Sequence, residues 1–127
     1  MPTADRKAVL AIGLDPAFVD LSALPGYTPD MVRTYLLSEI GRVREFGYEV
    51  ESCLIDRGET AEQVVEAALR ARAFDCVVIG AGLREPPELL QLFERVLNLV
   101  HTLAPQASIA FNSSPTDTAD AARRWLG

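Results

Sequence analysis

The chain has 127 residues, of which 49% are hydrophobic and 24% are charged. This length is typical of one domain, and this composition excludes a disordered, collagen-like or low-complexity chain, so we expect a single domain over residues 1–127. Twelve basic and eighteen acidic residues give a net charge of −6, and a negative field of this size disfavours nucleic acid and anionic membranes as partners.

The first predicted element is a strand at residues 8–14, which form a short apolar run. The run is too short to cross a membrane and lacks a signal-peptide cleavage site, so we expect a cytoplasmic protein. Residues 15–28 then separate this strand from the first helix, a connection much longer than the usual two to six residues or so. This loop is either a lid over a site or a surface excursion packed by its own apolar side chains, Phe18, Val19, Leu21 and Leu24.

The first helix is predicted to begin at Thr28-Pro29, where a threonine caps exposed amides and proline supplies a preset φ. It should end at Phe46-Gly47, because glycine suits the left-handed position after a helix. The second strand, residues 48–55, alternates polar and apolar residues as an edge strand does. The second helix follows from Thr60, which with Gln63 forms a capping-box pattern, and runs to about Arg72.

The third strand is predicted at residues 75–79, and because its residues 76–79 are uniformly apolar it should be central. The third helix, residues 88–103, carries its apolar residues on one arc of about 180°. This arc is wider than a helix needs to cover a sheet. Part of it therefore either packs in the core against a neighbouring helix or forms a homodimer interface.

The fourth strand is predicted at residues 107–111, and the last helix from Ser114-Pro115 to the end of the chain. Strand and helix thus alternate four times, which is the pattern of a parallel sheet with helices on both faces. Right-handed crossovers favour the strand order 2-1-3-4. We therefore expect an α/β fold, a three-layer α-β-α sandwich, with a fifth strand only if the tail supplies one.

Three segments, Cys-Val-Val-Ile-Gly-Ala-Gly (76–82), Leu-Phe-Glu (92–94) and Ile-Ala-Phe-Asn (109–112), resemble small bacterial proteins of the flavodoxin-like and Rossmann-like classes. The resemblance covers most of the chain and implies the fold without a particular activity. Gly80 and Ala81 stand where a phosphoacceptor receiver has an aspartate, and Leu14-Asp15-Pro16-Ala17 replaces a flavodoxin phosphate loop. No P-loop is present, and no cofactor is identified.

In an open parallel sheet of this order, ligands bind beyond the carboxyl ends of the strands where the order reverses. Here that point lies between the first and third strands. Candidate ligand-binding residues follow the first, third and fourth strands: Asp15, Gly80, Gly82, Arg84, Asn112 and Ser113.

Each candidate has a possible chemical role at that edge. Gly80 and Gly82 would let backbone amides approach an anion, and Arg84 would add positive charge. Asn112 and Ser113 would bind polar groups. Asp15 would be a base or an anchor. Glycines that form a tight turn and an aspartate that serves turn chemistry are equally ordinary interpretations.

The two cysteines, Cys53 and Cys76, lie far apart in apolar runs and predict buried thiols rather than a disulfide framework or a metal site. The favoured hypothesis is a domain that binds a small polar or anionic ligand at the ends of strands 1, 3 and 4. The alternatives are an interaction protein that self-associates through helix 88–103 and an enzyme with Asp15 as base.

Overall fold

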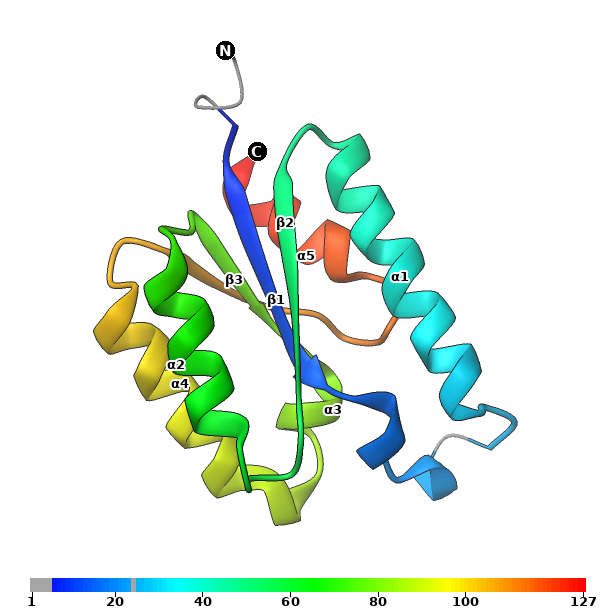
Figure 1. Ribbon diagram of the computed structural model, residues 1–127. Coiled ribbons are helices and arrows are strands. Elements are labelled where there is room, and N and C mark those ends of the chain that lie inside the picture. Colours follow the sequence, from blue (N-terminus) through cyan, green and yellow to red (C-terminus); the bar gives the residue numbers. More distant parts are fainter. Residues whose placement is uncertain (1–5, 24) are drawn as a thin grey trace.

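The computed structural model describes residues 6–23 and 25–127 and contains one parallel sheet with the strand order β2-β1-β3-β4 (Figure 1). The strands are β1 (Ala8–Leu14), β2 (Glu49–Ile55), β3 (Cys76–Ile79) and β4 (Ser108–Phe111). The predicted fold class and strand order are therefore confirmed. Among the described residues no fifth strand is present, because the tail forms a helix.

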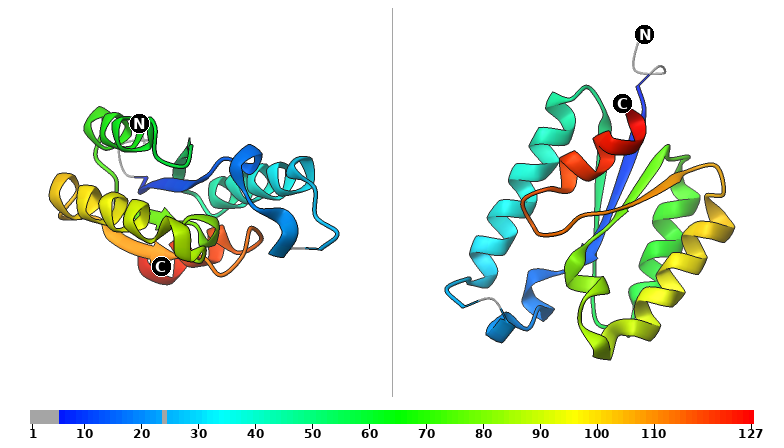
Figure 2. Two further views of the ribbon diagram at one scale, coloured as in Figure 1. Left: turned by 90° about the horizontal axis from the view of Figure 1, so that it is seen from below. Right: turned by 180° about the vertical axis from the view of Figure 1, so that it is seen from behind.

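Helices cover both faces of the sheet (Figure 2). One face packs against α2 (Ala61–Ala71) and α4 (Leu90–Leu103), and the other against α1 (Pro29–Glu45) and α5 (Thr118–Leu126). Because successive side chains of a strand point to opposite faces, Leu10, Ile12 and Leu14 of β1 face α2 and α4, whereas Val9 and Ala11 face α1 and α5.

The face toward α2 and α4 holds the larger side chains. Phe74, Leu10 and Ile79 are almost completely buried there. The apolar arc of α4 packs into the same core, with Leu92, Val96 and Val100 buried and its flanking apolar residues half-buried against them. Core packing against the sheet and α2 thus accounts for most of the broad apolar face, although Leu90 is 54% exposed.

The face toward α1 and α5 is built from smaller residues. Val9, Cys76, Val78 and Ala110 of the strands are buried there. They meet Val43 of α1 and three alanines of α5, Ala119, Ala121 and Ala122. Alanines let α5 approach the sheet closely, and they fill little volume of their own.

The predicted start and end of α1 are confirmed. The Thr28 Oγ1 accepts a hydrogen bond from the Met31 amide at 3.1 Å, and Gly47 adopts a φ of 93°, a left-handed value that favours glycine. None of the described helices is long and apolar enough to reach across a membrane.

The second helix begins after Thr60 as predicted, but its cap differs, and the predicted start of the last helix is wrong. Thr60 forms no capping box with Gln63, because its hydroxyl and amide both donate to the Asp56 carboxylate. The last helix begins at Thr118 rather than at Ser114. Residues 113–117 instead form a turn in which the Asp117 carboxylate accepts from the amides of Ser113 and Ser114.

A helical turn that was not predicted, α3 (Ala81–Arg84), follows β3 directly, and a short 3-10 helix (Pro87–Leu89) leads from it into α4. Gly80 is the residue at which the chain leaves the sheet for this turn. The third strand is thereby joined to α4 through compact structure at the carboxyl edge of the sheet.

Candidate functional site

A cavity of about 110 Å³ lies between α1 and the carboxyl half of the sheet. Its floor comes from β1, β2 and β3, its outer wall from α1, and its end from Asn112 and Thr118. This position spans the point between β1 and β3 where the strand order reverses, which is where open α/β sheets bind ligands. The lining residues are Ala11, Ile12, Gly13, Arg33, Leu36, Leu37, Ile40, Ser52, Leu54, Val78, Gly80, Asn112 and Thr118.

The cavity exists because small residues meet on one face of three neighbouring strands. In the register of the sheet Ala11 lies beside Ser52 of β2 and Val78 of β3, and Gly13 lies one step further along the same face. Gly80 continues that face beyond β3. Ala11 and Gly13 are only half-buried although β1 is a central strand, whereas Val9 of the same strand is 0% exposed. The sheet is therefore uncovered at one end of this face.

The wall of the cavity is mainly aliphatic. Leu36 and Ile40 of α1 are half-buried, as is Leu54 of β2, and Leu37 at the rim is 67% exposed. Leu36 and Ile40 lie on the side of α1 that faces the sheet, and the hollow beneath them explains their incomplete burial. The cavity thus offers an apolar wall with a few polar groups, which is the usual composition of a small-molecule site.

Asn112 forms the fixed polar end of the cavity. Its side chain is buried, its Oδ1 accepts from the Ala81 amide at 2.8 Å, and its Nδ2 donates to the Thr118 Oγ1 at 2.9 Å. One amide group thereby joins β4 to α3 and α5. Its rigid position supports the cavity, while both ends of the amide are already engaged by the protein.

Arg84 lies behind Asn112 and is not part of the cavity lining. Its guanidinium donates to the carbonyl oxygens of Ile79 at 2.9 Å and of Asn112 at 2.6 Å, and it lies over the Phe111 ring at 4.8 Å. Partial burial lowers the pKa of Arg84. These contacts tie the carboxyl ends of β3 and β4 together.

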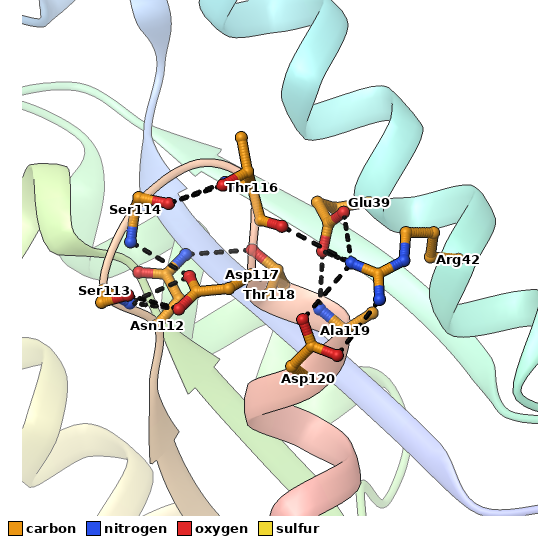
Figure 3. A network of polar contacts seen from close by, with 10 residues as sticks. All are labelled: Glu39, Arg42, Asn112, Ser113, Ser114, Thr116, Asp117, Thr118, Ala119 and Asp120. Carbon is orange, nitrogen blue, oxygen red and sulfur yellow. Dashed lines mark hydrogen bonds and ion pairs between the residues drawn. The ribbon is translucent and has the colours of Figure 1, made fainter.

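Ser113 is held inside the turn that precedes α5. Its amide and hydroxyl both donate to the Asp117 carboxylate (Figure 3). Partial burial raises the pKa of Asp117, but the hydrogen bonds from Ser113 and Ser114 outweigh it and hold that pKa below its usual range. The Ser113 hydroxyl therefore serves the turn and lies outside the cavity lining.

Asp15 lies at the end of β1 and is connected to the cavity through Arg33. Its Oδ1 accepts from the Ala17 amide at 2.9 Å, which caps the short 3-10 helix Pro16–Phe18, and from Arg33 Nη2 at 3.1 Å. Both side chains are partly exposed, 30% for Asp15 and 42% for Arg33. Arg33 lines the cavity and Asp15 does not.

The two candidate glycines differ. A Cβ atom at Gly80 would lie 3.5 Å from the Ile12 carbonyl oxygen and 3.7 Å from the Gly13 Cα, so the backbones of β1 and β3 approach closely there. At Gly82 the nearest atom would be 3.9 Å away, on Leu14, and the residue is exposed. Gly80 lines the cavity and Gly82 does not.

The structure thus places two of the six predicted site residues, Gly80 and Asn112, in the cavity lining. Arg84 is joined to Asn112 from the other side, and Asp15 reaches the cavity through its ion pair. The other lining residues were missed by sequence reasoning, among them Arg33, Leu36, Ile40, Ser52, Leu54 and Thr118. The small residues Ala11 and Gly13 alternate with large residues along β1, and this pattern could have indicated a cavity on one face of the sheet.

The loop at residues 15–28 packs beside the site. Pro16 is buried, Val19 contacts the α2/α4 core, and Arg57 Nη1 donates to the Phe18 carbonyl at 3.0 Å. Leu24 lies outside the described residues. The described part of the loop contributes nothing to the cavity lining, and a lid remains a prediction.

A polar cluster links α1 to the start of α5, outside the cavity lining (Figure 3). Glu39, only 4% exposed, accepts from the Ala119 amide at 2.9 Å and from Arg42 Nη1 at 2.9 Å, and Arg42 Nη2 lies 3.1 Å from Asp120. Glu39 lies one residue from Ile40 of the cavity wall. The cluster therefore fixes the distance between α1 and α5.

The lining of the cavity carries few polar groups. Arg33 supplies charge, Ser52 and Thr118 supply hydroxyls, Asn112 supplies an amide that is already hydrogen-bonded, and the remaining side chains are aliphatic. The two thiols lie elsewhere in the sheet, where burial raises the pKa of each to about 11. Across residues 6–23 and 25–127 no three metal-ligating side chains gather at one place.

A wider groove of about 660 Å³ runs along the solvent side of α2 and α4. Four of its five charged residues form ion pairs with one another: Arg70 contacts Glu66 at 2.9 Å and Arg95 contacts Glu62 at 3.9 Å. We regard it as the ordinary exposed surface between two packed helices.

Comparison with known proteins shows the fold of this chain and no more. No family model matches it, and no curated protein matches it significantly. Among solved structures it is similar to a fragment from Peptoclostridium difficile 630 titled a "putative lipoprotein", with a TM-score of 0.50 and 12% identity over 95% of this chain and 93% of that one.

Proposed function

We propose that this protein is a small-molecule-binding α/β domain whose ligand occupies the cavity between α1 and the carboxyl halves of β1 and β3. The observation that carries the proposal is the incomplete burial of Ala11 and Gly13 in a central strand. A central parallel strand is normally covered on both faces. A ligand in the cavity would cover the part that the protein leaves open.

The size of the cavity limits the ligand. A volume of about 110 Å³ is well below the 300 Å³ or more of sites for drug-sized molecules, and somewhat below an engineered cavity of about 150 Å³ that holds benzene. The ligand, or the part of it that enters, therefore has few non-hydrogen atoms. Nucleotides and flavins are too large to be enclosed here.

The polarity of the lining indicates a ligand with an apolar body and one polar or anionic group. The body would contact Leu36, Ile40 and Leu54, and the polar group would meet Ser52 or Arg33. The protein carries a net charge of −6, so an anion has to be attracted locally rather than by the field of the whole molecule.

The test is a screen of small probes by amide chemical shifts, using acids, amides, alcohols and small aromatics at millimolar concentration. We expect shifts centred on Ala11, Gly13 and Gly80. Ala11→Leu should fill the cavity and weaken binding at least tenfold. Ala67→Leu adds the same volume at an exposed position of α2 and should leave binding unchanged.

Two results would overturn the proposal. One is that no acid, amide, alcohol or aromatic small enough to fit the cavity binds to the protein at 25 °C. The other is binding that Ala11→Leu and Ala67→Leu affect equally, since the ligand would then lie elsewhere.

The proposal includes a cytoplasmic location, supported by the two free and buried cysteines, which are compatible with a reducing compartment. Cell fractionation with a tagged full chain tests this part, and recovery in the membrane or exported fraction would contradict it.

Self-association is the weaker candidate. The one feature that favours it on α4 is Leu90, which is 54% exposed at the start of the helix. Light scattering of the unmodified chain and of Leu90→Glu is the direct test: a dimer that the substitution dissociates would support a homodimer through α4, and a monomer at all concentrations would exclude it.

A further inference from the structure

We infer that the ligand of this cavity is a short-chain monocarboxylate whose carboxylate binds Arg33 in place of Asp15. The inference rests on the proposed function and names the ligand class for the same site. It starts from one contact at the mouth of the cavity: a guanidinium that lines the cavity already holds a carboxylate of the protein itself, at 3.1 Å.

Arg33 is suited to exchange one carboxylate for another. Its side chain is 42% exposed and that of Asp15 is 30% exposed, so water reaches both partners. An ion pair of this exposure contributes little to stability, and its exchange is therefore easy. A free carboxylate can also bind a guanidinium through two parallel hydrogen bonds, which is stronger than the single contact that Asp15 makes.

Asp15 has a second partner that keeps it in place after the exchange. Its Oδ1 accepts from the Ala17 amide at 2.9 Å and caps the helix Pro16–Phe18. Release from Arg33 therefore leaves the loop with its cap. The contact between Asp15 and Arg33 acts as an internal competitor that a ligand carboxylate displaces.

The remaining lining selects the body of the acid. The wall formed by Leu36, Ile40 and Leu54 is aliphatic, and the floor at Ala11 and Gly13 presents no polar side chain. With the share of liquid volume of one water at about 30 Å³, a cavity of about 110 Å³ accommodates roughly four groups of that size. An acid of about four or five carbons fills it, with its charged end at Arg33.

A monocarboxylate is favoured over a phosphate by charge. Arg33 is the only guanidinium in the lining of this cavity, Asp15 stands beside it, and the net charge of the chain is −6. A dianion would meet one cation and the repulsion of the whole molecule. A carboxylate brings one charge, which one guanidinium matches.

The experiment is a titration of the unmodified protein with acetate, propionate, butyrate, valerate and hexanoate, followed by amide shifts at constant ionic strength. We expect affinity to rise to a maximum at butyrate or valerate and to fall for hexanoate. The amides of the same two acids, which have the same shape without the charge, should bind at least tenfold more weakly.

Three variants localise the charge. Arg33→Gln should weaken butyrate binding at least tenfold, whereas Arg70→Gln, which removes the same charge from the exposed side of α2, should change it less than twofold. Asp15→Asn keeps an oxygen for the Ala17 amide and removes the competing charge, so it should strengthen binding about three- to tenfold. Thermal unfolding of each variant verifies that it is folded.

The outcomes separate this inference from the proposed function. If amides bind as well as acids, or if Arg33→Gln binds butyrate as the unmodified protein does, the carboxylate assignment is overturned, while a loss of probe binding in Ala11→Leu still supports the cavity. If Ala11→Leu has no effect on any probe, the cavity itself is overturned. Inorganic phosphate binding more tightly than butyrate would also overturn the assignment.

Discussion

The two faces of the sheet are made by the same four strands and are packed in different ways. Toward α2 and α4 the strands present leucines and isoleucines, which are buried together with Phe74. Toward α1 and α5 they present mainly valine, alanine, glycine and serine, with Cys76 and Leu54, and a cavity remains at the carboxyl end. One face therefore supplies most of the hydrophobic stabilisation, and the other leaves room for a ligand.

On the less filled face, hydrogen-bonded polar side chains set the distances between the helices and the sheet. Glu39 caps α5 and binds Arg42, and Asn112 joins β4 to α3 and α5 (Figure 3). Such groups are costly to bury unless they are paired, and each of them is paired. Their directional hydrogen bonds fix the spacing of the helices. The cavity therefore stays open, whereas a cavity lined only by aliphatic side chains would tend to collapse.

The largest difference between the faces should appear when a large side chain is removed. Leu10→Ala, on the filled face, should lower the free energy of unfolding by about 2–5 kcal/mol, because Leu10 is 0% exposed and its removal leaves a void. Leu36→Ala, beside the existing cavity, should cost less than half of that. Urea unfolding measures both. Equal losses would mean that the cavity wall is packed as tightly as the core.

Alkaline pH should destabilise both faces through their buried thiols, Cys53 on the filled face and Cys76 on the other. Burial raises the pKa of each from 9.0 to about 11, so the unfolded state loses its proton first. The full stability is present below about pH 9 and is lost as the pH rises toward 11, by about 2 kcal/mol for each thiol.

Urea unfolding between pH 8 and 11 follows this loss, and Cys53→Ala and Cys76→Ala each remove one contribution. The difference from the unmodified protein isolates the thiol from other groups that titrate in this range. Variants whose pH curves run parallel to that of the unmodified protein would contradict the assignment.

Removal of the polar link between α1 and α5 should have an intermediate effect. Glu39→Ala deprives the buried Ala119 amide of its acceptor and should lower the free energy of unfolding by about 1–3 kcal/mol. Glu39→Gln retains an oxygen for that amide and should cost less. Asp120→Ala, at a side chain 53% exposed, should change stability by less than about 0.5 kcal/mol. A larger effect of Asp120 than of Glu39 would disprove the capping role.

The smallest effect is expected when volume is added to the cavity. Ala11→Val should change the free energy of unfolding by less than about 1 kcal/mol in either direction, because the added methyl groups enter existing space. Ala8→Val makes the same change in the same strand on the filled face, where Ala8 is 3% exposed, and should cost about 1–3 kcal/mol. Denaturant unfolding of both variants measures the two changes. A larger loss of unfolding free energy for Ala11→Val than for Ala8→Val would mean that the cavity has no room for the added methyl groups.

Much of the fold could be predicted from the chain because its signals are local. The apolar run Cys76–Ile79 marks the central strand, Thr28-Pro29 and Gly47 mark the limits of α1, and the order of elements determines the parallel sheet. The start of α5 was missed because Asp117 competes with Ser114 for the exposed amides, and either residue makes a plausible cap.

The sequence predicted a site at the edge of the sheet where the cavity lies, with residues that only partly match the cavity lining. Arg84 and Ser113 have the chemistry of ligand groups, but each bonds to the protein itself. Arg33 was missed because it lies in the first turns of a helix, where an arginine is ordinary. Its place beside the cavity depends on where α1 packs.

The sequence by itself determined the alternation of strands and helices and the order of the strands, because these follow from periodicity, turn residues and chain connectivity. Only the tertiary structure decided that the α1 face is hollow. A cavity is a difference between the volume that the backbone encloses and the volume that side chains fill. That difference depends on the register that brings Ala11, Ser52 and Gly80 together and on the distance at which Glu39 holds α1 from α5.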